Sequence, residues 1–440
     1  MTFYSTNGES DHVSFLEAAE TGLAPDGGLY MPGSLPRLSL PFDSHKPDRI
    51  PDIRELAKAA ATPFLKESLS VQEIDDLISD AITMGAPLVK LSDSLLVLEL
   101  FHGPTLAFKD FGARFMARLF SKHRSESDKD LVVLVATSGD TGGAVASGFY
   151  GLDGVHVCLL YPKGKVSDVQ RKQMTTLGKN ITALEVEGTF DDCQMLVKRA
   201  FSDDDLNQTL RLSSANSINV ARLLPQSFYY LSAYFQLKQY SEADPMFVVP
   251  SGNFGNLTAG IMAEKMGMPV AGFVAATNRN DVVPDYLKGE KFLPRVSVQT
   301  ISNAMDVGNP SNFDRIRALY DYDDDAIRKN IKGYSFTDEE TREKIRQVFN
   351  RYGYVADPHT AVGLLAAEYF ERDFDSKMPR IVLSTAHPSK FPDVVEDEID
   401  QKVEVPARLM KSADLPEKSM PMSSDYSAFR RKLIDTYSQY

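Results

Sequence analysis

The sequence has few cysteines, no leader-like start and no long apolar run. Cys158 and Cys193 are its only cysteines, too few for the disulfide framework of a secreted protein and without the CxxC spacing of a zinc site. The first residues do not combine a basic region with an apolar run, so they predict no signal peptide. No stretch of about 18 apolar residues predicts a membrane span. These absences predict a cytoplasmic protein with two buried thiols.

The sequence also lacks an excess of positive charge. The net charge of −13 at pH 7 leaves no basic footprint for nucleic-acid binding. The sequence contains no GxxxxGK[ST], and its Gly-rich loops do not supply GxGxxG, so the common nucleotide signatures are missing. The seven histidines lack the spacing of metal ligands, and no metal is expected. The acidic segment 321–332 lacks the glycine and the terminal acid of a calcium loop and is predicted to be a solvated turn.

Strand-like and helix-like patterns alternate along most of the chain. The apolar runs LVVLVA (131–136), MFVVP (246–250) and RIVLST (380–385) are typical of strands buried on both faces. Helical periodicity between such runs predicts parallel sheets with helices on both faces, which is an α/β fold. A long aromatic helix is expected near residues 220–238.

The length of the chain suits two or three domains. Residues 1–90 include a Pro- and Gly-rich stretch and are predicted to form an N-terminal wrapping segment. We expect a smaller α/β lobe at 112–210 and a larger lobe that combines 90–111 with 211–440.

Three loops that follow predicted strands are candidates for a ligand site, because ligands of parallel sheets bind beyond the carboxyl ends of the strands. They are TSGDTGGA (137–144), SGNFGN (251–256) and TAHPSKF (385–391). In the first two, glycines let backbone N–H groups turn inward and a helix N-terminus follows, which suits an anion. Each is equally well explained as an ordinary strand–helix turn.

Lys109 stands in the mostly small, aromatic and apolar stretch HGPTLAFKDFG. One interpretation is a helix lysine that pairs with Asp110. The other is an amine that an apolar pocket makes nucleophilic and that forms a Schiff base. With an anion loop nearby, the aldehyde would be pyridoxal phosphate. His102, His359 and His387 lie beside the candidate loops, and lone histidines are more often structural than catalytic.

Long segments of the chain match one family in the same order. They are GLAPDGGLYMP, ELFHGPTLAFKDFGARFMA, ATSGDTGGAVA, LYPKGKVS, SANSINVARLL, VPSGNFGNLTAG, AATNRNDVVP, SNAMDVGNPSN and STAHPSKF. In these motifs the chain resembles the threonine synthase family, whose members are pyridoxal-phosphate enzymes of fold type II. Within that family it resembles the bacterial and fungal type. The resemblance implies that O-phospho-L-homoserine and water become L-threonine and phosphate. It is compatible with a monomer or a homodimer.

The resemblance also implies roles for individual residues. Lys109 matches the Schiff-base lysine, and Thr385 matches the hydroxyl partner of the pyridine nitrogen. Asp140 falls beside the cofactor ring, where many relatives of the wider fold type carry Asn. The other matches are the cofactor-phosphate loop Gly252, Asn253, Phe254, Gly255 and Asn256, the loop around the substrate carboxylate with Thr137, Ser138 and Thr141, and the substrate-phosphate residues Asn216, Ser217 and Arg222.

The motifs leave alternatives open for the function and for single residues. A serine/threonine dehydratase of the same fold type is one alternative, although SANSINVAR would give it an anion grip that its substrate does not need. A non-catalytic relative that binds a phosphorylated ligand is another, although it would not need Lys109. Asn253 and Asn256 could cap the next helix, and Arg222 could form a structural ion pair.

Overall fold

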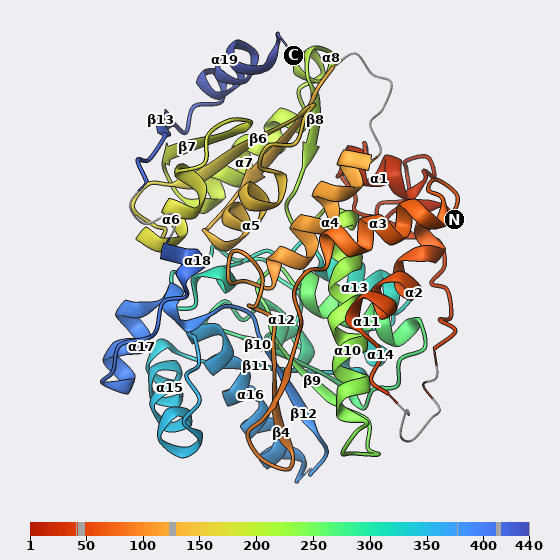
Figure 1. Ribbon diagram of the computed structural model, residues 1–440, viewed down its shortest axis with the longest axis vertical. Helices are drawn as coiled ribbons and strands as arrows, with labels where there is room; N and C mark the ends of the chain where they lie inside the picture. The colour runs from red at the N-terminus through yellow and green to blue at the C-terminus, as the bar shows by residue number, and fades with distance from the viewer. Residues whose placement is uncertain (41, 43–48, 123–128, 376, 411–414, 440) are drawn as a thin grey trace. The chain divides into compact units, whose positions relative to one another are not determined.

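The computed structural model describes residues 1–40, 42, 49–122, 129–375, 377–410 and 415–439. Two compact units are present. Unit 1 comprises Met1, Met31–Phe108 and Leu223–Glu404, and unit 2 comprises Thr2–Tyr30, Lys109–Arg222 and Val405–Tyr440. Each unit contains one of the two large sheets (Figure 1). The α/β class with parallel sheets, predicted from the alternating patterns, is confirmed.

Unit 1 is built on a six-stranded sheet in the order β11-β10-β9-β12-β4-β3. Its strands are β3 (Leu88–Lys90), β4 (Leu95–Glu99), β9 (Met246–Pro250), β10 (Gly272–Thr277), β11 (Ile331–Ser335) and β12 (Arg380–Ser384). All neighbours run parallel except β3, which is antiparallel to β4. Arg380 lies opposite both Leu95 and Met246, so β9, β12 and β4 end at the same edge of the sheet.

Helices cover the sheet of unit 1. The long helix α16 (Pro358–Phe374) packs on β9, β10 and β12, and Val248, Val382 and Phe370 belong to the core cluster that results. The other helices of the unit are α2 (Ile53–Leu65), α3 (Val71–Ala81), η1 (Leu224–Gln226), α10 (Ser227–Leu237), α11 (Gly255–Lys265), α12 (Val282–Leu287), η2 (Asn303–Met305), α13 (Phe313–Leu319), α14 (Asp324–Asn330), α15 (Asp338–Tyr352), η3 (Pro388–Lys390) and α17 (Pro392–Ile399).

Unit 2 is built on a fully parallel five-stranded sheet in the order β13-β7-β6-β5-β8. Its strands are β5 (Leu131–Ala136), β6 (Val155–Pro162), β7 (Ile181–Glu187), β8 (Arg211–Ser214) and β13 (Ser419–Ser423). Every residue of β5 is buried, as its apolar sequence predicts, because helices pack on the sheet. Cys158 and Cys193 are buried here, and burial raises the pKa of both thiols to about 12.

In unit 2, helices α5 and α7 contact β5 and β6. The described helices of the unit are α1 (Phe15–Thr21), α4 (Lys109–Lys122), α5 (Asp140–Phe149), α6 (Asp168–Thr175), α7 (Phe190–Phe201), α8 (Asp204–Thr209), α9 (Val220–Leu223), α18 (Ala407–Met410) and α19 (Tyr426–Tyr437). Two short strands complete the N-terminal region, β1 (Phe3–Ser5) and β2 (Tyr30–Pro32).

The two units differ from the predicted lobes at both ends of the chain and at two internal boundaries. Residues 109–111 and 211–222, expected in the larger lobe, belong to unit 2. The sequence places residues 405–440 in the larger lobe, whereas in the structure they belong to unit 2. The reason is that β13 pairs with β7, while Phe429 and Leu433 of α19 are fully buried in the core of unit 2; α19 lies beside β13 in Figure 1. The N-terminal segment expected at 1–90 divides between the units after Tyr30.

Some local elements also differ from the expectation. The aromatic helix expected at 220–238 is divided into α9, η1 and α10, because Pro225 cannot donate a helical hydrogen bond. The acidic segment expected as a solvated turn holds α14 and the start of β11, and the Asp323 side chain caps α14. The apolar runs of the sequence do not predict β8 and β11, because the sequences of these strands, RLSS and IKGYS, are not continuously apolar.

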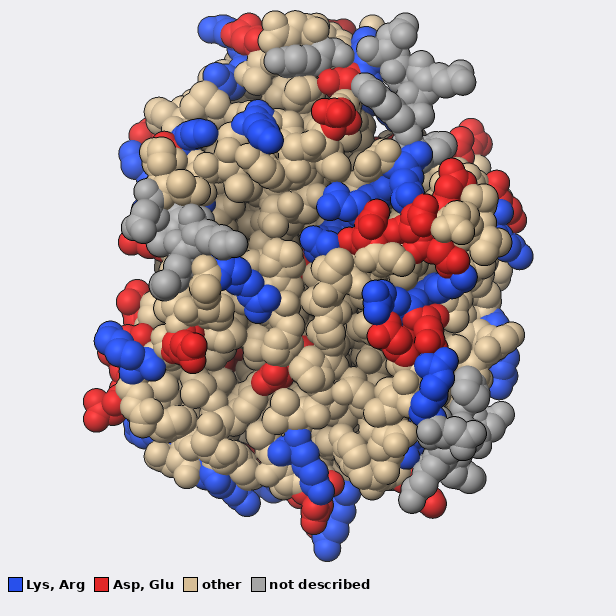
Figure 2. All heavy atoms as spheres, viewed as in Figure 1, with Lys and Arg blue, Asp and Glu red and all other residues tan. Residues whose placement is uncertain are grey.

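Charges of both signs are mixed on the surface. On the face shown in Figure 2, Lys and Arg side chains lie among Asp and Glu side chains instead of forming one basic field. Among the residues that the structure describes, no helix combines the length and the apolar character needed to cross a membrane.

The packing of α19 predicts a large effect of one substitution. Phe429→Ala removes a fully buried ring from the core of unit 2 and is expected to lower the free energy of unfolding by about 3–5 kcal/mol. Arg431→Ala, at an exposed position of the same helix, is expected to change it by less than about 0.5 kcal/mol. Urea titrations followed by circular dichroism measure both values, and equal effects would contradict this packing of α19.

Candidate active site

Three segments of unit 1 leave the same edge of its sheet, because β9, β12 and β4 are adjacent and parallel. Residues 251–256 follow β9, and residues 385–391 follow β12. Residues 100–108 follow β4 and lead directly into Lys109. The topology therefore gathers two of the predicted ligand loops with the segment before the lysine, at the edge where parallel sheets bind their ligands.

The loop 251–256 packs tightly against a neighbouring segment of unit 1. Gly252 has no room for a side chain, since a Cβ there would lie 2.7 Å from Met305 Cα and 2.8 Å from the carbonyl oxygen of Ala304. Asn253 Oδ1 accepts a hydrogen bond from the Ser311 N–H at 2.6 Å. Asn253 thus holds the neighbouring segment, and the N-cap position of α11 is occupied by Phe254.

The loop ends at the N-terminus of α11. Phe254 precedes the helix with φ at 61°, a left-handed conformation that costs a non-glycine residue about 1–2 kcal/mol. Helix geometry leaves the N–H groups of the first turn without intrahelical partners, and the side chain of Phe254 does not cap them. Together with the helix dipole, these amides favour an anion at this position.

Asn256 adds a side-chain donor to the same helix end. Its Oδ1 accepts the hydroxyls of Tyr229 at 2.7 Å and Tyr230 at 2.9 Å. Burial raises the pKa of both phenols well above the ordinary value, so both remain donors. Asn256 Nδ2 is buried and has no hydrogen-bond partner in the described part of the chain. A buried donor of this kind indicates an acceptor on a bound ligand.

The segment before Lys109 is fixed to the loop that carries Thr385. The Phe108 N–H donates to the Thr385 carbonyl at 2.9 Å, and the His387 N–H donates to the Leu106 carbonyl at 3.0 Å. Lys109 is the next residue after Phe108. The hydrogen bonds therefore fix the chain of unit 1 up to the residue before Lys109.

A buried lysine strengthens this attachment. Lys390 is fully buried, and its Nζ donates to the Thr105 carbonyl at 3.0 Å. Leu106, the following residue, has φ at 59°, a strained conformation that persists when the surroundings fix it. The sequence shows Lys390 in the STAHPSKF motif without indicating which atom it would hold.

In unit 2, Lys109 opens α4, and Arg222 lies against the same first turn. A Cβ on Gly112 would lie 2.9 Å from Arg222 Nε and 2.7 Å from its carbonyl oxygen. The buried guanidinium donates from Nη1 to the Ala215 carbonyl. Burial lowers the pKa of Arg222 to about 10, and the charge of Asp110 acts in the opposite direction. Arg222 is therefore a buried cation at neutral pH.

Asn216 and Asn219 shape the turn that leads to Arg222. Asn216 Nδ2 donates to the Ala136 carbonyl at 2.7 Å, and its Oδ1 accepts from the Ala136 N–H at 3.2 Å. Asn219, which the sequence analysis did not single out, donates to two backbone carbonyls at 2.7 and 2.8 Å. The amide of Asn216 thus holds the end of β5, and the half-buried Ser217 lies between the two asparagines in sequence.

The loop after β5 is closed on itself by Thr137. Its Oγ1 accepts from the N–H groups of Gly139 at 3.0 Å and Gly142 at 2.8 Å. Gly139 has φ at 134°, which a side chain would disfavour. Thr137 therefore shapes this turn, whereas Ser138 and Thr141 are partly exposed.

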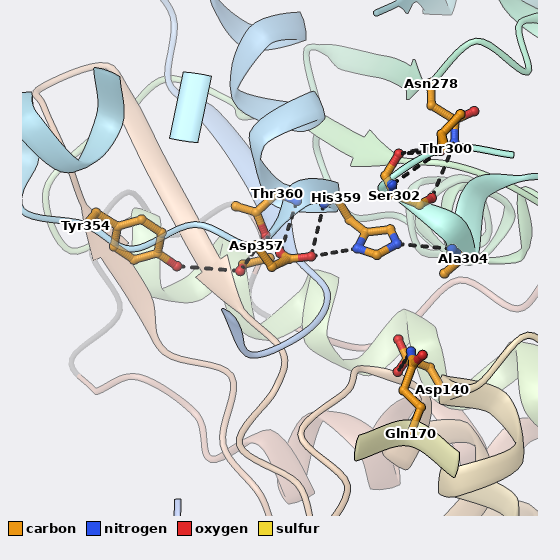
Figure 3. Close-up of polar contacts among 11 residues, drawn as sticks. Asp140, Gln170, Asn278, Thr300, Ser302, Ala304, Tyr354, Asp357, His359 and Thr360 are labelled. Atoms are coloured by element: carbon orange, nitrogen blue, oxygen red, sulfur yellow. Dashed lines mark hydrogen bonds and ion pairs between the residues drawn. The ribbon is translucent and has the colours of Figure 1, made fainter. Parts of the chain in front are cut away.

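Asp140 is held by Gln170, a residue that the sequence analysis missed. Both side chains are buried, and Gln170 Nε2 donates to Asp140 Oδ1 at 2.9 Å (Figure 3). Gln170 Oε1 accepts from Ser167 in the capping box of α6, which turns the amide nitrogen toward Asp140. The S-x-x-Q pattern of residues 167–170 predicts the capping box, although it does not predict the contact with Asp140.

Two further motifs, AATNRNDVVP and SNAMDVGNPSN, meet in a buried polar network of unit 1. Asp306 Oδ1 accepts from Asn278 Nδ2 at 2.8 Å and from the Thr300 hydroxyl at 2.7 Å, and Asp306 Oδ2 accepts from the Thr300 N–H at 3.0 Å. Burial raises the pKa of Asp306 to about 6, against the opposing effect of these hydrogen bonds. The network thus fixes the segment that packs on Gly252.

Comparison with known proteins identifies the family. The model described as pyridoxal-phosphate dependent enzyme matches residues 80–384, and those for the threonine synthase N terminus and for threonine synthase, C-terminal, match residues 2–82 and 360–432. Threonine synthase of Escherichia coli strain K12 is 39% identical over 99% of this chain and 100% of its own length. The chain belongs to the threonine synthase family.

Solved structures of threonine synthases have the same fold. The crystal structure from Escherichia coli has a TM-score of 0.91 and covers 99% of this chain and 100% of its own, at 39% identity. The pyridoxal-phosphate-bound threonine synthase from Brucella melitensis has a TM-score of 0.89, with 34% identity over 99% of both chains. Fold type II is confirmed, and pyridoxal phosphate is the cofactor of the family. The orphaned Asn256 amide and the first turn of α11 fit its phosphate group.

The pKa of Asp306 predicts a pH dependence of stability. Since the folded value of about 6 exceeds the unfolded value of about 3.9, the folded protein binds more protons between these pH values. The contribution of Asp306 to stability is present below about pH 4 and is lost as the pH rises through 6, by up to about 3 kcal/mol.

Urea unfolding of the wild type and of Asp306→Asn at pH values from 4 to 7 measures this effect. The free energy of unfolding of the wild type relative to the variant is expected to fall across the interval. A difference that stays constant, or rises, would contradict the raised pKa.

Proposed function

We propose that the protein converts O-phospho-L-homoserine and water into L-threonine and phosphate, with Lys109 as the residue that binds the cofactor. One observation carries the proposal: Lys109 opens the turn of α4 against which the buried cation Arg222 packs at Gly112. This reaction needs an amine and a phosphate-binding group close together. A serine/threonine dehydratase needs the amine alone, because its substrates carry no phosphate.

Unit 1 supplies the residues for the cofactor in this proposal. The amides at the N-terminus of α11 and Asn256 Nδ2 would hold the cofactor phosphate, and the hydroxyl of Thr385 would face the pyridine nitrogen. The residues assigned to the phosphate loop are Gly252, Asn253, Phe254, Gly255 and Asn256. The hydrogen bond between Phe108 and Thr385 supports the assignment, because it ties the residue before Lys109 to the same group of loops.

Lys109 has two tasks. Bound pyridoxal phosphate supplies an electron sink that acidifies the substrate carbon next to the amino group. Lys109 holds the cofactor through its amine and then carries protons at the Cα and Cβ atoms of the substrate. Removal of a proton from Cβ lets the γ-phosphate leave with the electron pair of its C–O bond. A proton added at Cγ then completes the methyl group, and water added at Cβ becomes the hydroxyl of threonine. Ser138 and Thr141 bind the substrate carboxylate, on the turn that Thr137 shapes.

Arg222 and Ser217 bind the phosphate of the substrate. A guanidinium offers two parallel N–H donors to phosphate oxygens, and the pKa of about 10 keeps it charged at neutral pH. Asn216 contributes by holding the turn to the end of β5. This arrangement explains why the SANSINVARLL segment combines asparagines that hold backbone with one buried arginine.

Asp140 lies beside the cofactor ring in the proposal. An ionised carboxylate next to a phenolate oxygen is unfavourable, so Asp140 either turns away from the ring oxygen or shares a proton with it. The hydrogen bond from Gln170 Nε2 to Oδ1 holds the Asp140 carboxylate in its place.

The same proposal takes the two compact units as the lobes of the enzyme. It places the protein in the cytoplasm, as a monomer or homodimer without a nucleic-acid partner. The two buried thiols, which do not form a disulfide framework, support a reducing compartment.

The reaction itself is the first test. The protein loaded with pyridoxal phosphate is expected to release phosphate and L-threonine from O-phospho-L-homoserine in equal amounts. Lys109→Ala is expected to lower kcat by at least about 10²–10⁴-fold, because the proton carrier is removed. Lys122→Ala, at the other end of α4, is expected to keep the wild-type rate.

Parallel assays for phosphate, threonine and 2-oxobutyrate separate the alternatives. Turnover of serine or threonine without release of phosphate from phosphohomoserine would favour the dehydratase. No turnover of any of these substrates by the loaded protein would favour the non-catalytic relative.

The role of Arg222 gives a second prediction. Arg222→Lys keeps the charge and loses the two-pronged donor, so KM for O-phospho-L-homoserine is expected to rise by about 10–100-fold. Arg211→Lys is the matched control, because Arg211 pairs with Glu20 elsewhere in unit 2 and should leave KM near the wild-type value. Steady-state kinetics measure both, and an unchanged KM for Arg222→Lys would contradict the assignment.

A further inference from the structure

A buried Asp–His pair lies close to the phosphate loop of unit 1, and the proposed function does not use it. Asp357 and His359 are each no more than 2% exposed at the start of α16, and His359 Nδ1 lies 2.6 Å from Asp357 Oδ2 (Figure 3). Asp357 also accepts from the N–H groups of His359 at 3.0 Å and Thr360 at 3.1 Å. The carboxylate is thus the cap of the helix as well as the partner of the imidazole.

The other ring nitrogen of His359 determines its tautomer. The Ala304 N–H donates to His359 Nε2 at 3.2 Å, and Figure 3 shows the ring between Asp357 and Ala304. Because a backbone N–H can only donate, Nε2 must accept, and the ring hydrogen is on Nδ1, facing Asp357. His359 therefore links a carboxylate to a backbone amide.

The amide that His359 accepts belongs to the segment beneath the phosphate loop. Ala304 and Met305 form most of η2. A Cβ built on Gly252 would lie 2.8 Å from the Ala304 carbonyl oxygen and 2.7 Å from Met305 Cα. The Gly252 backbone blocks any shift of η2 toward the loop. A shift of η2 away from the loop would remove the support of the loop at Gly252. The hydrogen bond to His359 thus acts at the point where η2 meets the loop.

The pair is connected to the Thr385 loop as well. The Thr360 hydroxyl contacts the Asp357 carboxylate and lies 2.8 Å from the Ser384 hydroxyl. Ser384 ends β12 and directly precedes Thr385. A continuous set of hydrogen bonds therefore runs from the strand end beside Thr385, through Asp357 and His359, to the support of Gly252.

We propose that His359 is a positioning residue for the cofactor phosphate. It holds η2 against Gly252 through the hydrogen bond between its Nε2 and Ala304, and Asp357 fixes the tautomer that makes this bond. The inference rests on the proposed function, since it takes 251–256 as the phosphate loop. It predicts that losing the Ala304 bond weakens binding of pyridoxal phosphate while losing the Asp357 bond alone does so much less.

Two substitutions separate the two bonds. His359→Asn places an amide nitrogen near the former Nδ1, which keeps the donor to Asp357 and removes the acceptor for Ala304. His359→Gln places a carbonyl oxygen near the former Nε2, which keeps that acceptor and gives up the donor to Asp357. His156→Asn, which disturbs the His156–Asp130 pair of unit 2, is a control for general effects of such a change.

Titration of each apoprotein with pyridoxal phosphate gives the Kd, and ³¹P NMR of the loaded protein reports the surroundings of its phosphate. We expect His359→Asn to raise the Kd by at least about tenfold, as for the loss of a buried hydrogen bond, and to shift the ³¹P resonance. His359→Gln and His156→Asn should stay within about threefold of the wild type, with an unshifted resonance. Equal losses in both His359 variants, or no loss in either, would overturn the proposal.

Two more variants keep the test decisive. If His359→Asn does not fold, Asp357→Asn replaces it in the test. An amide at position 357 favours the other tautomer of His359, so the Kd for pyridoxal phosphate should rise. The rise should vanish when His359→Gln is also present. Persistence of the rise in the double variant would overturn the proposal.

Gly252→Ala tests the assignment of residues 251–256 as the phosphate loop. If Gly252→Ala weakens binding of pyridoxal phosphate while His359→Asn does not, the positioning role of His359 is wrong and the loop assignment stands. If Gly252→Ala has no effect on this binding, the loop assignment is wrong, and the proposal for His359 is wrong with it.

Discussion

The parallel pairing of β9, β12 and β4 is the constraint on which the rest of unit 1 depends. It brings the loop 251–256, proposed to hold the cofactor phosphate, to one edge of the sheet with the Thr385 loop and the segment before Lys109. Segments distant in sequence can then hold one another with single hydrogen bonds to the backbone. Phe108 is fixed to Thr385, Thr105 is fixed by the buried Lys390, and the first turn of α11 stays open to an anion.

Unit 2 depends on a close approach between two helices. Gly112 lets Arg222 lie against the first turn of α4, so the lysine and the buried cation share one location within the unit. Burial of Arg222 has an electrostatic cost, which its lowered pKa of about 10 reflects. In the proposed function, this buried charge binds the phosphate of the substrate.

Much of this arrangement is predictable from the sequence, for physical reasons. Strands buried on both faces have continuous apolar runs, and β5 and β9 occupy the residues predicted for them. The Gly-rich loops after β5 and β9 are also found where the turn chemistry places them. Edge strands such as β8 and β13 were missed, because a strand with a single neighbour in its sheet does not need an apolar run. The packing of residues 405–440 on unit 2 depends on tertiary contacts that no local pattern encodes.

The residues around the site show the same limit. The motifs single out Lys109 and Asn256 as candidates, because the chemistry of these motifs is local. Gln170, Lys390 and the Asp357–His359 pair act through partners that are distant in sequence or come from the fold, so a lone histidine at 359 gave no reason to expect more than a structural role. Asn216 shows the reverse case, because its side chain holds the backbone of Ala136 in a way that the motif alone does not reveal.

The most direct test of the account is to locate the covalent attachment of the cofactor. The protein loaded with pyridoxal phosphate would be reduced with borohydride, digested and mapped by mass spectrometry. The account predicts a phosphopyridoxyl group on the peptide that contains Lys109, and none on that peptide when the Lys109→Ala protein is treated in the same way. Attachment to Lys390 or to another lysine would contradict the assignment from which the roles of the surrounding loops follow.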